Sequence, residues 1–175
     1  MSGFEPKMID AVPNSARRWR RVVTGERAGR SAIVTDNTEC PFRMAVEGAE
    51  GIVVTEMWRT GRDPECAPNG PETCTMPLAF GPVAGGTVAL ILEWAPDAQL
   101  FGTTDPSVAN AATTHATDTI DYLHVIDGEI HVMLEEGESC LRTGDTLVQR
   151  GTSHGWSNRS AKPCRMFVVM VSAKS

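Results

Sequence analysis

The sequence predicts an all-β protein that folds as one small barrel. Short segments rich in β-branched residues recur along the chain, and turn signals separate them. The strongest signal is Asp127-Gly128, which stands between two apolar segments and is typical of a tight β-hairpin. The 16 glycines and 11 prolines are spread throughout, and sustained helical periodicity is hard to find. Many short strands at regular spacing are typical of a sandwich or a small barrel.

The expected strands fall into two groups, an N-terminal extension at residues 17–62 and a barrel core at residues 87–172. The second group has the denser pattern of strands and turns, and it contains every histidine. The only helix expected is a short one within residues 6–20. Residues 63–86 are rich in proline, glycine and cysteine, and we expect this loop to cover the barrel mouth. The eight expected strands are 21–24, 32–35, 52–58, 87–94, 120–126, 130–134, 146–148 and 166–171.

Length and composition indicate a single globular domain over residues 1–175. Hydrophobic residues make up 41% and charged residues 22% of the chain, which is typical of a folded protein. The 16 basic and 22 acidic residues give a net charge of −6, which disfavours general binding to nucleic acid or an anionic membrane. No apolar run approaches the roughly 20 residues of a membrane helix, and the N-terminus lacks a signal-peptide pattern. We therefore expect a cytoplasmic protein.

The five cysteines are expected to be reduced thiols. They are scattered, and none forms the C-x-x-C pair of a zinc ribbon. A cytoplasmic location also favours free thiols over disulfides. Cys66 and Cys74 lie close enough within the long loop to pair, which leaves one disulfide as the alternative.

The segment Gly151-Thr152-Ser153-His154-Gly155 matches G-x-S-x-G, the pattern around the nucleophile of many serine hydrolases. That chemistry needs an acid and then a histidine later in the chain than the serine. No Asp or Glu follows Asp145, and no histidine follows His154. Chain order therefore excludes a serine hydrolase of this type.

Candidate metal ligands come from the histidines and one aspartate. Alternate residues of an extended segment share a face, so His115 and Asp121 would point to one side and His124 to the other. His154 follows in a later strand-and-turn region. Two imidazoles and a carboxylate form a set that binds a divalent metal while keeping coordination positions open. We expect His124 and His131 to be surface or packing residues instead.

Two segments resemble the motifs of the cupin superfamily of small β-barrel proteins. The first motif has the form G-x5-H-x-H-x3,4-E-x6-G, and residues 115–128 fit it with His115 at the first histidine and Asp121 at the glutamate. The second has the form G-x5-P-x-G-x2-H-x3-N, and residues 144–158 fit it with His154 at the histidine. The resemblance implies a double-stranded β-helix, or jelly-roll, barrel with an N-terminal strand extension.

The two segments depart from the family pattern at positions that matter for metal binding. Thr117 stands where the family has its second histidine, and Ala109 stands where it has its first glycine. Asp121 is one methylene shorter than the family's glutamate. The second motif lacks its proline and is one residue shorter between its two glycines. The resemblance therefore implies a reduced ligand set of His115, Asp121 and His154.

The amino-acid sequences of both motifs are similar to those of a subgroup of single-domain cupins from bacteria and fungi. Some of these occur beside biosynthetic genes for polyketide-like compounds and are described as oxidoreductases. The resemblance implies a small-molecule enzyme in which Fe, Mn, Zn or Ni, held inside the barrel, acts as a Lewis acid. Decarboxylation, dehydration, isomerisation and oxygenation of an organic acid or polyketide-like compound are all compatible with such a site.

Two alternatives stay open beside this hypothesis. One is a metal-free enzyme of the same fold that uses His154 or Asp121 as acid or base. The other is a barrel that binds a small ligand without catalysis. Small cupins commonly pair through N-terminal strands and one sheet face, so the resemblance also implies a homodimer. Candidate substrate contacts are one hydroxyl and four aromatic side chains, Thr117, Trp58, Trp94, Tyr122 and Trp156.

Overall fold

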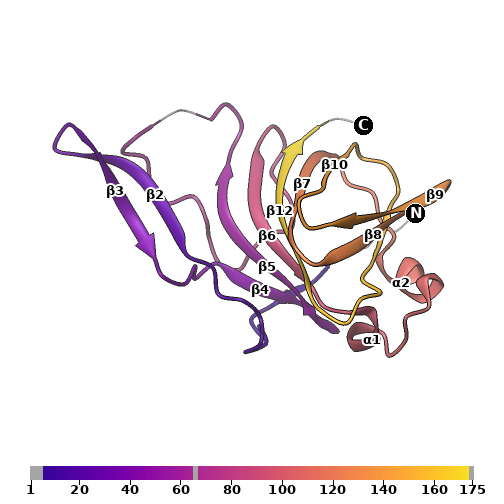
Figure 1. Cartoon of the computed structure of the whole chain (residues 1–175). Helices are drawn as coiled ribbons and strands as arrows, with labels where there is room; N and C mark the ends of the chain where they lie inside the picture. Colours follow the sequence, from indigo (N-terminus) through magenta and orange to yellow (C-terminus); the bar gives the residue numbers. More distant parts are fainter. Residues whose placement is uncertain (1–5, 65–66, 174–175) are drawn as a thin grey trace.

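Two antiparallel β-sheets face each other across one hydrophobic core, which takes side chains from both (Figure 1). The computed structural model describes residues 6–64 and 67–173. The larger sheet has the order β1 (Met8–Ile9), β4 (Arg43–Val46), β5 (Ala49–Thr60), β6 (Thr87–Trp94), β12 (Cys164–Ser172), β7 (Thr119–Asp127) and β10 (Thr146–Gln149). The smaller sheet has the order β11 (Gly155–Ser157), β8 (Glu129–Leu134) and β9 (Gly137–Arg142). This arrangement confirms the predicted all-β jelly-roll barrel.

Four further elements lie outside the two facing sheets. β2 (Arg21–Arg27) and β3 (Arg30–Asn37) form a separate antiparallel sheet, which projects from the barrel on the side away from the helices (Figure 1). The helices α1 (Asp97–Leu100) and α2 (Pro106–Thr113) lie between β6 and β7 in the chain, and α2 packs beside β11. Across the described residues, neither helix has the length and apolar character needed to cross a membrane.

Alternation of apolar side chains explains why the central strands form. In β12, Met166 and Val168 are buried in the core, whereas Phe167 between them is exposed. In β7, Leu123 and Val125 are buried in the same core. A period of two is the pattern of a strand with one covered face, and each of the eight expected strands lies within an observed one.

The helix expected within residues 6–20 is wrong. The first part of this segment forms β1, which pairs with β4 at the edge of the larger sheet. The rest is irregular chain, in which Ala16 is buried against Ala45 and Val53 on the sheet face opposite the main core. Pairing and burial against the sheet therefore hold this segment, and Pro13 has no N–H for a helical hydrogen bond.

The described part of the long loop is fastened to both the barrel and the projecting hairpin. Leu78 belongs to the main core, and its backbone N–H donates to Met44 Sδ at 3.0 Å. Glu72 accepts two hydrogen bonds at 2.8 Å from the guanidinium of Arg21, which lies in β2. The loop therefore bridges two parts of the fold that the strands alone leave apart.

The thiols in the described residues are free. Cys40, Cys74 and Cys164 are buried, and Cys140 is half-buried. Cys66 lies outside the described residues, and so does the alternative pairing with Cys74.

Replacing Gly128 with alanine should destabilise the fold more than the same change at Gly144. Both glycines have a left-handed backbone, with φ of 90° and 95° respectively, so each substitution carries a similar strain of about 1–2 kcal/mol. A Cβ at Gly128 would also lie 2.8 Å from the Pro163 carbonyl oxygen, whereas a Cβ at Gly144 meets nothing within 4 Å. Urea unfolding should show Gly128→Ala less stable than Gly144→Ala by at least about 1 kcal/mol. Equal losses would show that the close contact at Gly128 is absent.

Candidate functional site

The candidate site begins where α2 packs against β11. Asp105 caps the start of α2 by accepting a hydrogen bond from the Ser107 N–H at 2.9 Å, and Pro106 occupies the first helical position. At the other end, the Trp156 N–H donates to Thr113 Oγ1 at 2.9 Å. A Cβ on Gly155 would lie 2.6 Å from Asn110 Oδ1, so glycine permits this close approach of helix and strand. The chain that leaves α2 is thereby held beside the start of β11.

This packing brings His115 and His154 side by side. Each residue's backbone N–H donates to the other's carbonyl, at 3.0 Å from His115 to His154 and at 2.9 Å in return. Their ring centroids lie 4.4 Å apart, with the planes inclined at 51°. His154 is buried and His115 is half-buried. The structure thus joins two of the three predicted ligands, which lie 39 positions apart in the chain.

Both imidazoles are oriented by the same kind of backbone contact. Nδ1 of His115 lies 2.7 Å from the carbonyl oxygen of Thr113, and Nδ1 of His154 lies 2.8 Å from that of Thr152. A carbonyl can only accept a hydrogen bond, so these contacts place the proton on Nδ1 and leave Nε2 as the acceptor nitrogen. This is the tautomer and orientation that metal-binding histidines commonly adopt.

Burial keeps His154 neutral. The pKa of His154 is lowered to about 4, mainly by desolvation and to a smaller extent by the charge of His115, while the contact with Thr152 acts in the opposite direction. At neutral pH the ring is therefore an uncharged base or ligand. Trp156 contributes to this burial, because it is itself buried and meets the His154 ring edge-on, with centroids 5.5 Å apart.

Asp121 is a buried carboxyl group in β7 with an unused acceptor. Its Oδ1 is enclosed and has no hydrogen-bond partner among the described residues. Desolvation raises the pKa of Asp121 above its usual value, while hydrogen bonding to Thr119 and the charge of His115 oppose the rise. The carboxyl group thus holds its proton to a higher pH than an exposed aspartate does.

Two hydroxyl groups connect Asp121 to a cavity at the end of the barrel. Thr117 Oγ1 lies 2.7 Å from Thr119 Oγ1, and Thr119 in turn interacts with the Asp121 carboxyl group. Both threonines line a half-open cavity of about 230 Å³, together with Arg150 and Gly151. The cavity therefore has a polar wall that leads to the buried carboxyl group and a cation at its rim.

Asp121 also belongs to a row of residues that crosses the larger sheet in register. Two of its members, Arg59 and Gln149, were not among the predicted site residues. Arg59 donates to the buried carboxylate of Glu56 at 2.6 and 2.5 Å, and Gln149 donates to the Thr152 hydroxyl at 2.8 Å. The row runs Gln149, Asp121, Met170, Val88 and Arg59.

Three of the predicted aromatic contacts lie away from the histidine pair. Tyr122 is 54% exposed and points to the opposite face of β7 from Asp121. Trp58 pairs with Ala89 and lies 5.4 Å from the Arg21 guanidinium, toward the projecting hairpin. Trp94 is buried in the main core at the far end of β6. None of the three borders the histidine pair, whereas Trp156 does.

The three predicted ligands do not converge fully. The group of three ligating side chains whose donor atoms all lie within 4.8 Å of one another, over residues 6–64 and 67–173, is Glu129, His131 and Cys140 on the smaller sheet. His115 and His154 are adjacent, but Asp121 does not complete such a group with them. The side chains of His115, His154 and Asp121 are of the types that bind a divalent ion. Only the two histidines are close enough together to share one.

Comparison with known proteins identifies the fold family. The family described as the cupin domain matches residues 103–170, which contain α2, His115, Asp121 and His154. These residues of the chain form a cupin domain. Among solved structures, a putative ethanolamine utilization protein from Salmonella typhimurium covers 91% of this cupin and 100% of its own chain, at 14% identity and a TM-score of 0.46.

Curated relatives of this cupin come from filamentous fungi. Phomopsin biosynthesis cluster protein D of Diaporthe leptostromiformis is 42% identical over 102 residues, which are 57% of this chain and 47% of that protein. The cupin-domain-containing oxidoreductase virC of Hypocrea virens is 27% identical over 166 residues, which are 90% of this chain and 78% of that protein. The first relatives are thus matched over less than half of their own length.

The His154→Gln variant should resist acid better than the wild type. The pKa of His154 is about 4 in the folded chain and about 6.5 when unfolded, so between these values the unfolded state binds the extra proton. Stability that is present above pH 6.5 is therefore lost as the pH falls toward 4, by about 3 kcal/mol. Glutamine does not titrate and should remove this loss.

Unfolding free energies measured from pH 7 to pH 4 in the presence of a chelator test this expectation. His124→Gln is the matched control, because His124 is exposed and its replacement should keep the wild-type dependence. An acid limb that is unchanged in His154→Gln would contradict the neutral, desolvated state of this histidine.

Proposed function

We propose that this cupin is an enzyme that acts on an oxygenated small molecule within its barrel, with a divalent metal ion held by His115, His154 and Asp121. The observation that carries the proposal is the shared orientation of the two imidazoles, each with Nδ1 against a backbone carbonyl and Nε2 left as the acceptor. The partnerless Oδ1 of Asp121 supplies an anionic donor. The names of the fungal relatives, an oxidoreductase and biosynthesis-cluster proteins, support small-molecule chemistry.

The metal, when bound, would act as a Lewis acid on a carbonyl, carboxylate or enol oxygen of the substrate. Fe, Mn, Zn and Ni all accept two imidazoles and a carboxylate. Thr117 offers a short hydroxyl side chain in place of the family's second histidine, so this position leaves room beside the ligands for substrate.

The surroundings of the site favour an anionic, oxygen-rich substrate. Arg150 brings positive charge to the rim of the cavity, and the Thr117 and Thr119 hydroxyl groups supply hydrogen bonds along its wall. The chain from Thr117 through Thr119 to Asp121 can also carry a proton between cavity and carboxyl group. An organic acid or a polyketide-like enol fits these contacts, and the reaction class is decarboxylation, dehydration, isomerisation or oxygenation.

Metal binding inside the barrel should depend on His154 and should strengthen on replacement of Thr117 with histidine. The measurement uses protein that carries Cys140→Ser, so that the group of Glu129, His131 and Cys140 on the smaller sheet does not contribute. Metal content per chain should then fall in His115→Ala and His154→Ala. His124→Ala should retain the metal, because His124 lies on the exposed side of β7. Thr117→His restores the family's donor and should tighten binding by at least about tenfold. Unchanged metal content in His154→Ala would contradict the proposed metal site.

The second candidate is acid–base catalysis without a metal. The incomplete convergence of Asp121 with the histidines favours it, and so does the raised pKa of Asp121, because a protonated carboxyl group can donate to substrate. In this case His154, uncharged at neutral pH, serves as the base and Asp121 as the acid.

Replacement of Asp121 with asparagine separates the two candidates. Asparagine keeps the shape and still donates a hydrogen bond, but it transfers no proton and carries no charge. A screen of keto acids, enols and lactones first supplies a substrate. If Asp121 is the acid, Asp121→Asn should lower kcat/KM by roughly 10²–10⁴ and leave metal content unchanged. Loss of metal together with activity would assign Asp121 as a ligand, and full activity would exclude both roles.

A further inference from the structure

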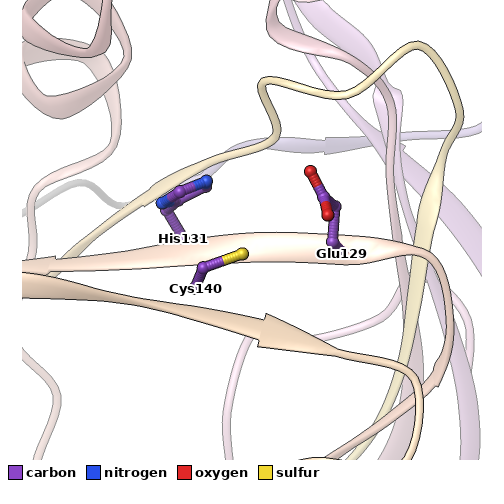
Figure 2. Close-up of side chains that lie close together, drawn as sticks. All are labelled: Glu129, His131 and Cys140. Carbon is purple, nitrogen blue, oxygen red and sulfur yellow. The ribbon is translucent and has the colours of Figure 1, made fainter.

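A second set of metal-ligating side chains lies on the smaller sheet, outside the barrel interior. Glu129 and His131 come from β8 and Cys140 from β9 (Figure 2), and their donor atoms all lie within 4.8 Å of one another. Neither cupin motif includes His131 or Cys140. This set therefore needs its own explanation.

The pairing of β8 with β9 places the three side chains on one face. His131 and Cys140 are directly opposite in the antiparallel register, and Glu129 lies two residues before His131 on the same strand face. Their neighbours Ile130 and Leu141, also directly opposite each other, are buried in the main core. The sheet itself therefore separates the three donors from the barrel interior.

His131 has an unsatisfied nitrogen in this position. Its Nδ1 is buried and makes no hydrogen bond to the described residues. This nitrogen lies 3.6 Å from the carboxylate of Glu138, whose two oxygens already accept hydrogen bonds from Arg159 at 2.8 and 2.5 Å. A buried nitrogen without a hydrogen-bond partner is unfavourable, so a ligand that engages the ring would stabilise this hairpin.

We propose that Glu129, His131 and Cys140 bind a zinc ion on the outer face of the smaller sheet. A thiolate and an imidazole favour zinc over magnesium or calcium, and the carboxylate completes a mixed set of sulfur, nitrogen and oxygen donors. The thiolate and carboxylate together neutralise the charge of the ion. Three protein donors leave the fourth tetrahedral position to water.

The surroundings allow the ion to enter and the ligands to close on it. Zinc bonds of about 2.0–2.3 Å require the donors to approach by roughly an ångström, which side-chain rotation supplies. Arg142 lies 3.4 Å from the Glu129 carboxylate, but its side chain is 65% exposed and can turn into solvent. An open cavity of about 490 Å³ beside Glu129, lined also by Arg142 and Ser160, provides access. The Cys140 thiol loses its proton to solvent on binding.

Titration with Co²⁺, which takes zinc sites, tests the thiolate contact directly. A cobalt–thiolate bond produces a charge-transfer absorption band in the near ultraviolet, which the histidines and aspartate of the interior site do not produce. The experiment uses the His154→Gln chain, in which the interior ligand pair is broken. We expect the band to saturate at one Co²⁺ per chain and Zn²⁺ to displace it.

Two variants and two controls decide the outcome. Cys140→Ser should abolish the band, and His131→Gln should weaken Co²⁺ binding by at least tenfold. Cys164→Ala removes a buried core thiol and His124→Gln removes an exposed histidine, and both should keep the band. Absence of the band in the His154→Gln chain, or its persistence in Cys140→Ser, would overturn the proposal. Because the band reports only thiolate ligation, either result is independent of the proposed enzyme function.

Discussion

The two reciprocal backbone hydrogen bonds between His115 and His154 are the constraint on which the candidate site depends. They tie the chain that leaves α2 to the chain that enters β11, so they join the segment preceding the larger sheet's β7 to the edge of the smaller sheet. Neither residue lies in a long strand, and the bridge is isolated. The close approach at Gly155 and the contacts of Thr113 hold the bridge in place. These contacts thus bring together two imidazoles that lie outside the regular strand pairing of the barrel.

The fold was largely predictable from the sequence because β-branched segments separated by turn signals favour short strands. The eight segments rich in β-branched residues all became strands, whereas β1, β4, β9 and β11 were missed. The sequence of β9, GESCLR, is mostly polar and short, and β11 has three residues, so neither has enough periodicity to be recognised. The start of α2 did carry a local signal, since Asp105 followed by Pro106 and Ser107 is a helix cap.

Only those residues of the candidate site that belong to linear sequence motifs were predictable. His115 and His154 were found from motif spacing, but the spacing says nothing of how far a shortened carboxylate such as Asp121 extends. Glu56 could have been predicted as a buried carboxylate, because it lies on the same strand face as the apolar residues Ile52 and Val54 in β5. Its partner Arg59 could not, because the pairing register shifts between Glu56 and Trp58 and breaks the alternation. The group of Glu129, His131 and Cys140 was likewise not predictable, because only the pairing register of β8 with β9 brings these residues together.

Burial acts on His154 and Asp121 in the same direction, toward the uncharged form. For His154 this has one consequence under either chemistry, because a neutral imidazole is both the metal-binding form and the base. For Asp121 the two chemistries need opposite states: a metal ligand must be ionised, whereas a general acid must keep its proton. A divalent ion nearby would reverse the effect of desolvation on this carboxyl group, and the Thr119 hydroxyl already opposes it. The protonation state of Asp121 is therefore the physical variable that divides the two mechanisms, and the rest of the barrel is compatible with both.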